Sequence, residues 1–175
     1  LTEFYDSPFA AHGADVEPNP AAAAAIETLA AKGYPLLLTT MPMFPPTAVR
    51  HRLAWAGIRP EAFARLTHYE NSCTVKPRPL YYAENLAAAG VDGTDVLMVG
   101  NNTVEDLSFM HLGADGYLVT DWLLDPAGFD LASVKHGTMA DFAAFAAALP
   151  PCANPAASVK TGTIDPAEAE AVRAA

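Results

Sequence analysis

The sequence is poor in cysteine and in basic residues, and it has no long apolar run. Its two cysteines, Cys73 and Cys152, are far apart and show no metal-ligand spacing, which argues against a disulfide framework and against a zinc site. Ten Lys and Arg stand against 20 Asp and Glu, and the net charge of -10 repels nucleic acid and anionic membranes. No apolar run approaches the roughly 20 residues of a membrane helix. We therefore expect neither nucleic acid nor a membrane as a partner, and a reducing cytoplasm is the default location.

What the sequence does have is an alternation of helix and strand signals. A chain of 175 residues can bury one ordinary core, so its length predicts one domain. Helix signals lie at 20–32, 49–56, 80–89, 104–112 and after a capping box at Thr138 and Asp141; strand signals lie at 34–40, 66–69, 96–99 and 117–120. This alternation predicts an α/β fold, a Rossmann-like parallel sheet with helices on both faces.

The segment 96–106 has the most informative pattern. Its four leading apolar residues predict a buried strand, and Gly100 lets the backbone turn where that strand ends. The amides and carboxylates that follow would project oxygen atoms at the carboxyl edge of the sheet, where ligands of such folds bind, and oxygen is the ligand that Mg²⁺ selects. These residues are Asn101, Asn102, Glu105 and Asp106. The alternative is an Asn-rich turn that caps the next helix.

Two earlier features complete an ordered set with this segment. Thr40 closes the apolar run 34–40, and Lys76 stands directly before Pro77 and the next predicted helix. In this order and at these intervals, the three features resemble motifs of the haloacid dehalogenase-like superfamily of hydrolases, most of which are phosphatases. The resemblance runs from about 19 to 149. Each motif is weak alone, whereas the ordered set is fairly specific.

The resemblance implies a magnesium-dependent phosphatase that acts on a small phosphorylated metabolite through an aspartyl-phosphate intermediate. Thr40 would donate its hydroxyl to a phosphoryl oxygen, and Met41 beside it would contact the substrate. Lys76 would neutralise charge on the nucleophile and on the transferring group. Asn102 and Asp106 would hold Mg²⁺. Without the resemblance, Thr40 is an ordinary strand-end residue and Lys76 is a solvated surface amine.

The sequence departs from the family pattern in two ways. Family members carry a nucleophilic Asp at the end of the first strand of the sheet, but here Asp6, Asp15 and Asp92 follow no buried strand. In addition, Asn102 stands where the family has a carboxylate, which removes one negative charge from the expected metal site. We therefore expect that this chain is the C-terminal part of a longer protein whose missing N-terminal segment holds the nucleophile.

The absent strand would lie in mid-sheet, between the strand that ends at Thr40 and the strand that ends at Gly100. Neighbouring strands lie about 4.8 Å apart, so its two neighbours would have to close roughly twice that distance or leave backbone groups unpaired. In this interpretation, residues 1–18 are the end of a helical cap or a linker, and residues 19–149 are the α/β core. Residues 150–175 are a Pro- and Ala-rich tail with little to pack against that core.

Two alternatives bear on this interpretation. A response-regulator receiver domain also places acids, a Thr or Ser and a Lys-Pro pair around magnesium, but there the acids come first, whereas here Lys76 precedes Asp106. A catalytically inactive relative that serves for binding or structure is favoured by the absent nucleophile and by Asn102. The five histidines show no ligand spacing, and we assign Trp55 and Trp122 to packing.

Overall fold

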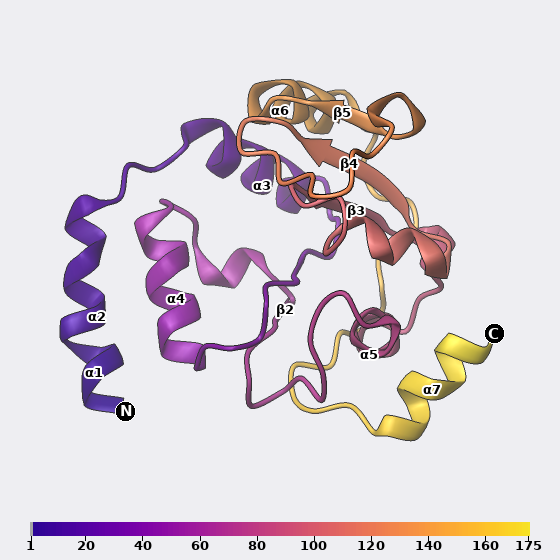
Figure 1. Ribbon diagram of the computed structural model, residues 1–175, viewed down its shortest axis with the longest axis horizontal. Coiled ribbons are helices and arrows are strands. Elements are labelled where there is room, and N and C mark those ends of the chain that lie inside the picture. Colours follow the sequence, from indigo (N-terminus) through magenta and orange to yellow (C-terminus); the bar gives the residue numbers. More distant parts are fainter. Residues whose placement is uncertain (1) are drawn as a thin grey trace.

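Helices cover both faces of short parallel sheets in the computed structural model, which describes residues 2–175 (Figure 1). The α-helices are α1 (Thr2–Asp6), α2 (Pro8–Ala11), α3 (Pro20–Ala31), α4 (Pro46–Trp55), α5 (Pro79–Ala89), α6 (Met139–Ala148) and α7 (Pro166–Ala174). The strands are β1 (Leu37–Leu38), β2 (Arg65–Leu66), β3 (Leu97–Gly100), β4 (Asp115–Val119) and β5 (Lys135–Gly137). Short 3-10 helices are η1 (His12–Asp15), η2 (Pro60–Ala62), η3 (Gly93–Asp95), η4 (Leu107–Leu112) and η5 (Leu131–Ser133). The mixed α/β architecture with parallel strands is the one that the sequence predicts.

The strands form two separate sheets. β1 pairs with β2, and β3, β4 and β5 pair in that order, with every pair parallel. Within residues 2–175 no strand pairing joins β1 to β3. The two strands are nevertheless neighbours, because Thr39 Oγ1 lies 3.8 Å from Met98 Sδ. The parallel strands are therefore interrupted between β1 and β3.

The side chains of β3 alternate between two apolar clusters. Leu97 and Val99 pack against a cluster that includes residues of α3 and α6, whereas Met98 belongs to a second cluster with residues of α5 and η4. Successive side chains of a strand point to opposite faces, so helices cover both faces of this sheet. The first cluster includes Leu29, Tyr117 and Phe142, and the second includes Tyr81, Tyr82, Leu86 and Phe109.

Three helix ends lie where the sequence predicts them. The side chain of Asn19 accepts a hydrogen bond from Ala21 N at the start of α3. Gly90 ends α5 with a φ of 63°, in the left-handed region that favours glycine. Thr138 and Asp141 form the predicted capping box of α6. Each of these contacts joins near neighbours in the chain, so a short stretch of sequence is enough to predict it.

Several predicted elements differ from the structure. The strands predicted at 34–40 and 66–69 are only two residues long, as β1 and β2. The helix predicted at 104–112 is wrong in type and in start, because only the 3-10 helix η4 forms there. The sequence does not predict β5, whose Lys135 and His136 are exposed and show no apolar alternation. An edge strand of this kind has too few apolar residues to reveal itself.

The C-terminal segment packs against the core, so the expectation of a tail with little to pack against is wrong. Ala169 of α7 is 0% exposed, and α7 lies against α5. Arg65 of β2 donates to the carbonyl oxygens of Lys160 and Gly162, at 2.9 and 2.7 Å. Ile164 before α7 is also buried, and Val172 of α7 packs against the cluster that includes Tyr81 and Tyr82, so a few apolar side chains are enough to dock this segment.

The N-terminal helices contact α4 through aromatic rings. The ring centroid of Phe9 lies 5.0 Å from that of Trp55 and 6.1 Å from that of Phe44. Gly13 lies against the same indole, where an added Cβ would be 2.2 Å from Trp55 Nε1. Trp55 is therefore a packing residue, as predicted.

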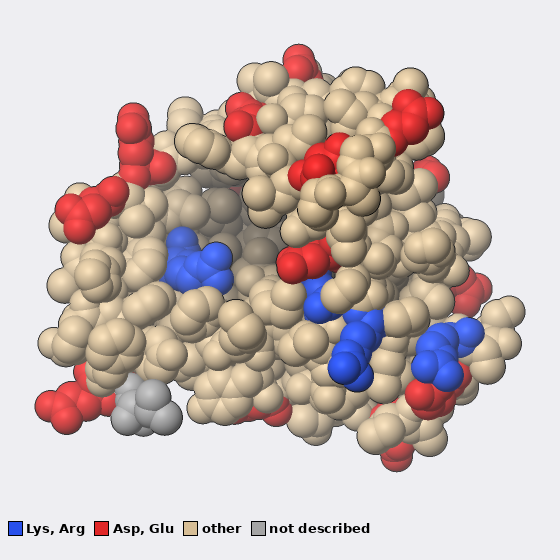
Figure 2. Space-filling view, viewed as in Figure 1, with Lys and Arg blue, Asp and Glu red and all other residues tan. Residues whose placement is uncertain are grey.

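Charge is unevenly distributed over the surface. On the face in Figure 2, acidic side chains lie mainly along the outline, whereas Lys and Arg gather in a few places across the middle. A chain with a net charge of -10 thus still presents basic groups together on one face. Of the helices in residues 2–175, none has both the length and the apolar character to cross a bilayer.

Candidate functional site

A buried ion pair between Lys76 and Asp106 is the centre of the candidate site. Lys76 Nζ lies 2.6 Å from Asp106 Oδ1, and the two side chains are 8% and 7% exposed. Lys76 belongs to the loop before α5, and Asp106 to the loop after β3. The alternative interpretation of Lys76 as a solvated surface amine is therefore wrong. Burial of two charges together is costly unless the geometry is good, which makes this pair unusual.

The other oxygen of Asp106 organises the loop that carries it. Asp106 Oδ2 accepts hydrogen bonds from the backbone N–H groups of Asn101 and Asn102, at 2.9 and 3.0 Å. The carboxylate lies so close to the chain that a Cβ added at Gly100 would be 2.1 Å from Oδ2. Gly100 thus permits a close approach of the carboxylate to the end of β3. These side-chain bonds use backbone donors of 101–106, and regular helical structure begins only after them, at Leu107.

Asn102 caps the same loop. Its Oδ1 accepts from the backbone N–H groups of Val104 and Glu105, at 3.0 and 2.9 Å. The Asn-rich turn that the sequence offers as the alternative is therefore present.

The residues present do not by themselves fit a magnesium site. Asn102 Oδ1 is used by two backbone donors, and both oxygens of Asp106 already accept hydrogen bonds. In the described part of the chain, no group of three or more His, Cys, Asp or Glu side chains could hold a metal ion. Hard cations take about six oxygen ligands, of which this loop offers few.

Hydrogen bonds from α5 connect Thr40 to the loop that carries Asp106. The carbonyl oxygen of Thr40 accepts from Tyr81 Oη at 2.7 Å and from Thr67 Oγ1 at 3.1 Å. The next residue, Tyr82, donates its hydroxyl to the carbonyl oxygen of Glu105. Two adjacent tyrosines of α5 thus connect the chain after β1 to the chain after β3, and the carboxyl ends of both strands lie at one edge. Met41 is half-buried beside Thr40.

Burial makes these two tyrosine hydroxyls harder to ionise. Desolvation raises the pKa of the Tyr81 phenol well above its ordinary value, and it does the same for Tyr82. Both hydroxyls therefore stay protonated at neutral pH. The sequence predicts a helix at 80–89 but no role for these tyrosines, because a helical pattern does not show which carbonyl oxygen a tyrosine hydroxyl will bind.

Trp122 lies beside the site and is wrongly assigned to packing. Its side chain is 82% exposed, the largest value among the exposed large apolar residues in the described chain. Its carbonyl oxygen accepts from Asn101 Nδ2, and Leu124 N donates to the carbonyl oxygen of Asn101 at 2.8 Å. The loop after β4 is thus bonded to the loop after β3.

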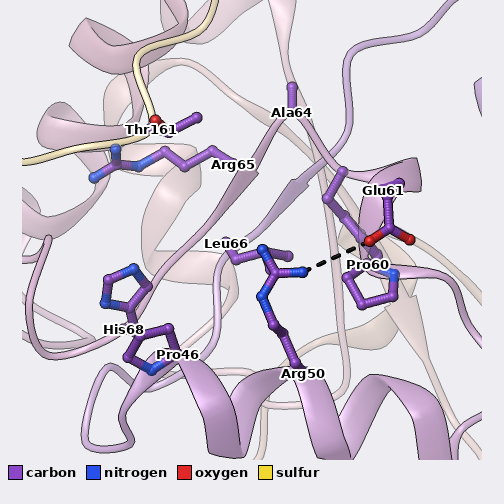
Figure 3. Close-up of a pocket in the computed structure, with 10 residues that line it drawn as sticks. Pro46, Arg50, Pro60, Glu61, Ala64, Arg65, Leu66, His68 and Thr161 are labelled. Atoms are coloured by element: carbon purple, nitrogen blue, oxygen red, sulfur yellow. Dashed lines mark ion pairs between the residues drawn. The ribbon is translucent and has the colours of Figure 1, made fainter.

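A separate pocket of about 200 Å³ lies against β2 (Figure 3). Arg50 of α4 lines it and pairs with Glu61 at 3.7 Å. His68 Nδ1 is buried there and has no hydrogen-bond partner among the residues described, and desolvation lowers the pKa of this imidazole. The guanidinium of Arg65 runs away from Arg50 toward Thr161. None of the residues predicted for the site lines this pocket.

Comparison with known proteins gives a likeness of fold. No protein-family model and no curated protein matches the chain. A crystal structure of an uncharacterized protein from Listeria monocytogenes serotype 4b is similar to it, with a TM-score of 0.54 and 18% sequence identity. The similarity covers 69% of this chain and 74% of that chain. At this identity the likeness shows the fold alone.

Proposed function

We propose that this chain is part of a haloacid dehalogenase-like hydrolase, a magnesium-dependent phosphatase that acts on a small phosphorylated metabolite through an aspartyl-phosphate intermediate. The nucleophilic Asp would lie on a strand outside this chain. The break between β1 and β3 supports the proposal, because the resemblance expects the nucleophile's strand there. Thr40 and the Lys76–Asp106 pair lie at the carboxyl ends of the strands that border this break.

In the strands on both sides of the break, every second peptide group bonds within its own sheet and the others point into the break. The carbonyl oxygens of Leu36 and Leu38 accept bonds from residues 64 and 67, next to β2, and Val96 O accepts from Asp115 N of β4. Peptide groups along a strand alternate in direction, so those of residues 37 and 39, and of residues 97 and 99, face the break. One further parallel strand would satisfy both edges. It would also cover β3, whose apolar residues Leu97, Met98 and Val99 suit a buried strand, although Leu97 and Val99 are only half-buried here.

In this proposal the residues of the chain position and stabilise a phosphoryl group. The Thr40 hydroxyl donates to one phosphoryl oxygen, and the Lys76 ammonium neutralises charge that develops as the group transfers. Asp106 positions Lys76 by accepting from its Nζ at 2.6 Å. Because the pair is buried, the ammonium is fixed in place before substrate binds, which costs no reorganisation during the reaction.

Of the two residues that the resemblance assigns to Mg²⁺, Asp106 is the one that could still take the ion. Asp106 offers carboxylate lone pairs that its present hydrogen bonds do not all use. The remaining oxygen ligands would have to come from the additional strand and from water, since Asn102 is engaged in its turn. When bound, the ion would supply positive charge next to the phosphoryl group.

The test is a magnesium-dependent assay of the complete gene product on generic phosphate esters. Thr40→Val removes one hydroxyl at nearly constant volume and leaves the carbonyl oxygen that Tyr81 binds, so the fold is retained. We expect Thr40→Val to lower kcat/KM by about a hundredfold and Lys76→Ala by about a thousandfold, in the range of lost transition-state donors. Lys135→Ala is the matched control, because that lysine is exposed and only weakly paired. Turnover that both site variants leave unchanged would remove these residues from the proposal.

A catalytically inactive module is the second candidate. The engagement of Asn102 and Asp106 within their own loop favours it, because such a loop is stable without any ligand. The same assay separates the two: absence of turnover in the complete gene product, with the fold intact, would favour the module over the enzyme.

A further inference from the structure

Exposed apolar side chains concentrate at the carboxyl edge of the sheets. Among the described residues, nine large apolar side chains are exposed, and six of them lie in loops that follow strands at this edge. They are Met43 after β1, Tyr69 and Val75 after β2, Val104 after β3, and Trp122 and Leu124 after β4. Small-molecule sites have this composition, with apolar walls around a few converging polar groups.

Trp122 is the largest of these side chains, and hydrogen bonds to other loops hold its backbone and that of the adjacent residues in place. Asn101 Nδ2 donates to its carbonyl oxygen, and Leu124 forms a parallel bridge with Asn102. On the other side, Asp121 accepts a hydrogen bond from Met139 N at the start of α6, at 2.6 Å. The indole is thus exposed on a fixed backbone rather than on a free loop.

The same contacts connect Trp122 to the ion pair. Asn101 binds the carbonyl oxygen of Trp122 through its side chain and binds Asp106 Oδ2 through its backbone N–H. Asp106 in turn binds Lys76. Leu124 and Val104, one in each of the two bonded loops, are 56% and 39% exposed. Exposed apolar side chains thus lie on the loop that carries Asp106 and on the loop bonded to it.

We propose that Trp122, with Leu124 and Val104, is the platform on which a planar, apolar leaving group of the substrate stacks. This inference rests on the proposed function, and it narrows the substrate class to phosphate monoesters of aromatic or similarly flat alcohols. A ligand of this class matches both parts of the site, since its phosphoryl group meets the ammonium and its ring meets the indole.

The test compares two phosphonates, which resemble phosphate esters but cannot be hydrolysed, by calorimetric titration of the complete gene product with Mg²⁺. Phenylphosphonate is expected to bind about tenfold more tightly than methylphosphonate, because only the former can stack on an aromatic ring. Trp122→Ala should abolish this preference and leave the affinity for methylphosphonate unchanged. Trp122→Phe should retain most of the preference. Because the side chain is exposed, none of these changes should alter the melting temperature.

Trp55→Phe is the matched control, since that tryptophan packs against Phe9 and should not affect the preference. It also leaves Trp122 as the sole tryptophan among residues 1–175, so in this variant phenylphosphonate should change the fluorescence of Trp122. A preference that survives Trp122→Ala would overturn the platform while leaving the proposed function intact. Failure of the wild-type protein to bind either phosphonate would overturn both.

Discussion

Replacing Lys76 with Met is expected to lower the free energy of unfolding by about 3 kcal/mol, because the change leaves the Asp106 carboxylate buried without its counter-charge. Both side chains are more than nine-tenths buried, so water cannot compensate for the loss. Urea denaturation at neutral pH measures the effect directly. The exposed ion pair between Lys160 and Glu168 is the control, since both of its side chains are about half exposed. Lys160→Met breaks this pair and should lower the free energy of unfolding by less than about 1 kcal/mol.

A double-mutant cycle separates the ion pair from the rest of the loop. Asp106→Asn keeps one oxygen for the backbone N–H groups of Asn101 and Asn102 but removes the charge. We expect the double variant of Lys76 and Asp106 to cost clearly less than the sum of the two single variants, since neither charge is then left alone. Strict additivity would mean that the two groups do not interact in solution.

Replacing Arg65 with Met is expected to cost about 3 kcal/mol as well, and to loosen the C-terminal segment. Arg65 is 1% exposed, and its guanidinium donates to three backbone carbonyl oxygens, two of which belong to Lys160 and Gly162. Met fills similar space but leaves these buried acceptors unsatisfied, at about 1 to 3 kcal/mol each when no water reaches them.

Limited proteolysis together with urea denaturation measures this second effect. Cleavage near residues 155–162 should become faster in Arg65→Met, because the contacts that hold this segment to β2 are gone. Arg59→Met is the matched control, since Arg59 is an exposed arginine paired with Glu27. If Arg65→Met resists protease as well as Arg59→Met does, the guanidinium does not anchor the segment.

The parts of this fold that depend on near neighbours could be predicted from the sequence. The cap at Asn19, the turn at Gly90 and the capping box at Thr138 are each set by residues two to four positions apart. The parts that depend on distant residues could not. No local pattern shows that Arg65 will bind a carbonyl oxygen 97 positions later, or that Ala169 and Val172 will be the residues of α7 that pack against the core.

The candidate site likewise has a part that could be predicted from the sequence and a part that could not. Lys76 and Asp106 are 30 positions apart and could be proposed together only because their order resembles a known set of motifs. Their burial as an ion pair, the two tyrosines that join the loops, and the exposure of Trp122 all depend on how the sheets and α5 pack. Those features follow from the three-dimensional arrangement, which the sequence pattern does not contain.

Hydrogen exchange at the break between β1 and β3 tests the central claim most directly. In this chain, the amides of Leu97 and Val99 face the break and should exchange fast, whereas that of Met98 faces β4 and should exchange slowly. In the complete gene product, the account predicts that all three are protected, because a further strand pairs with β3. Exchange at Leu97 and Val99 that stays as fast in the complete gene product as in this chain would contradict it.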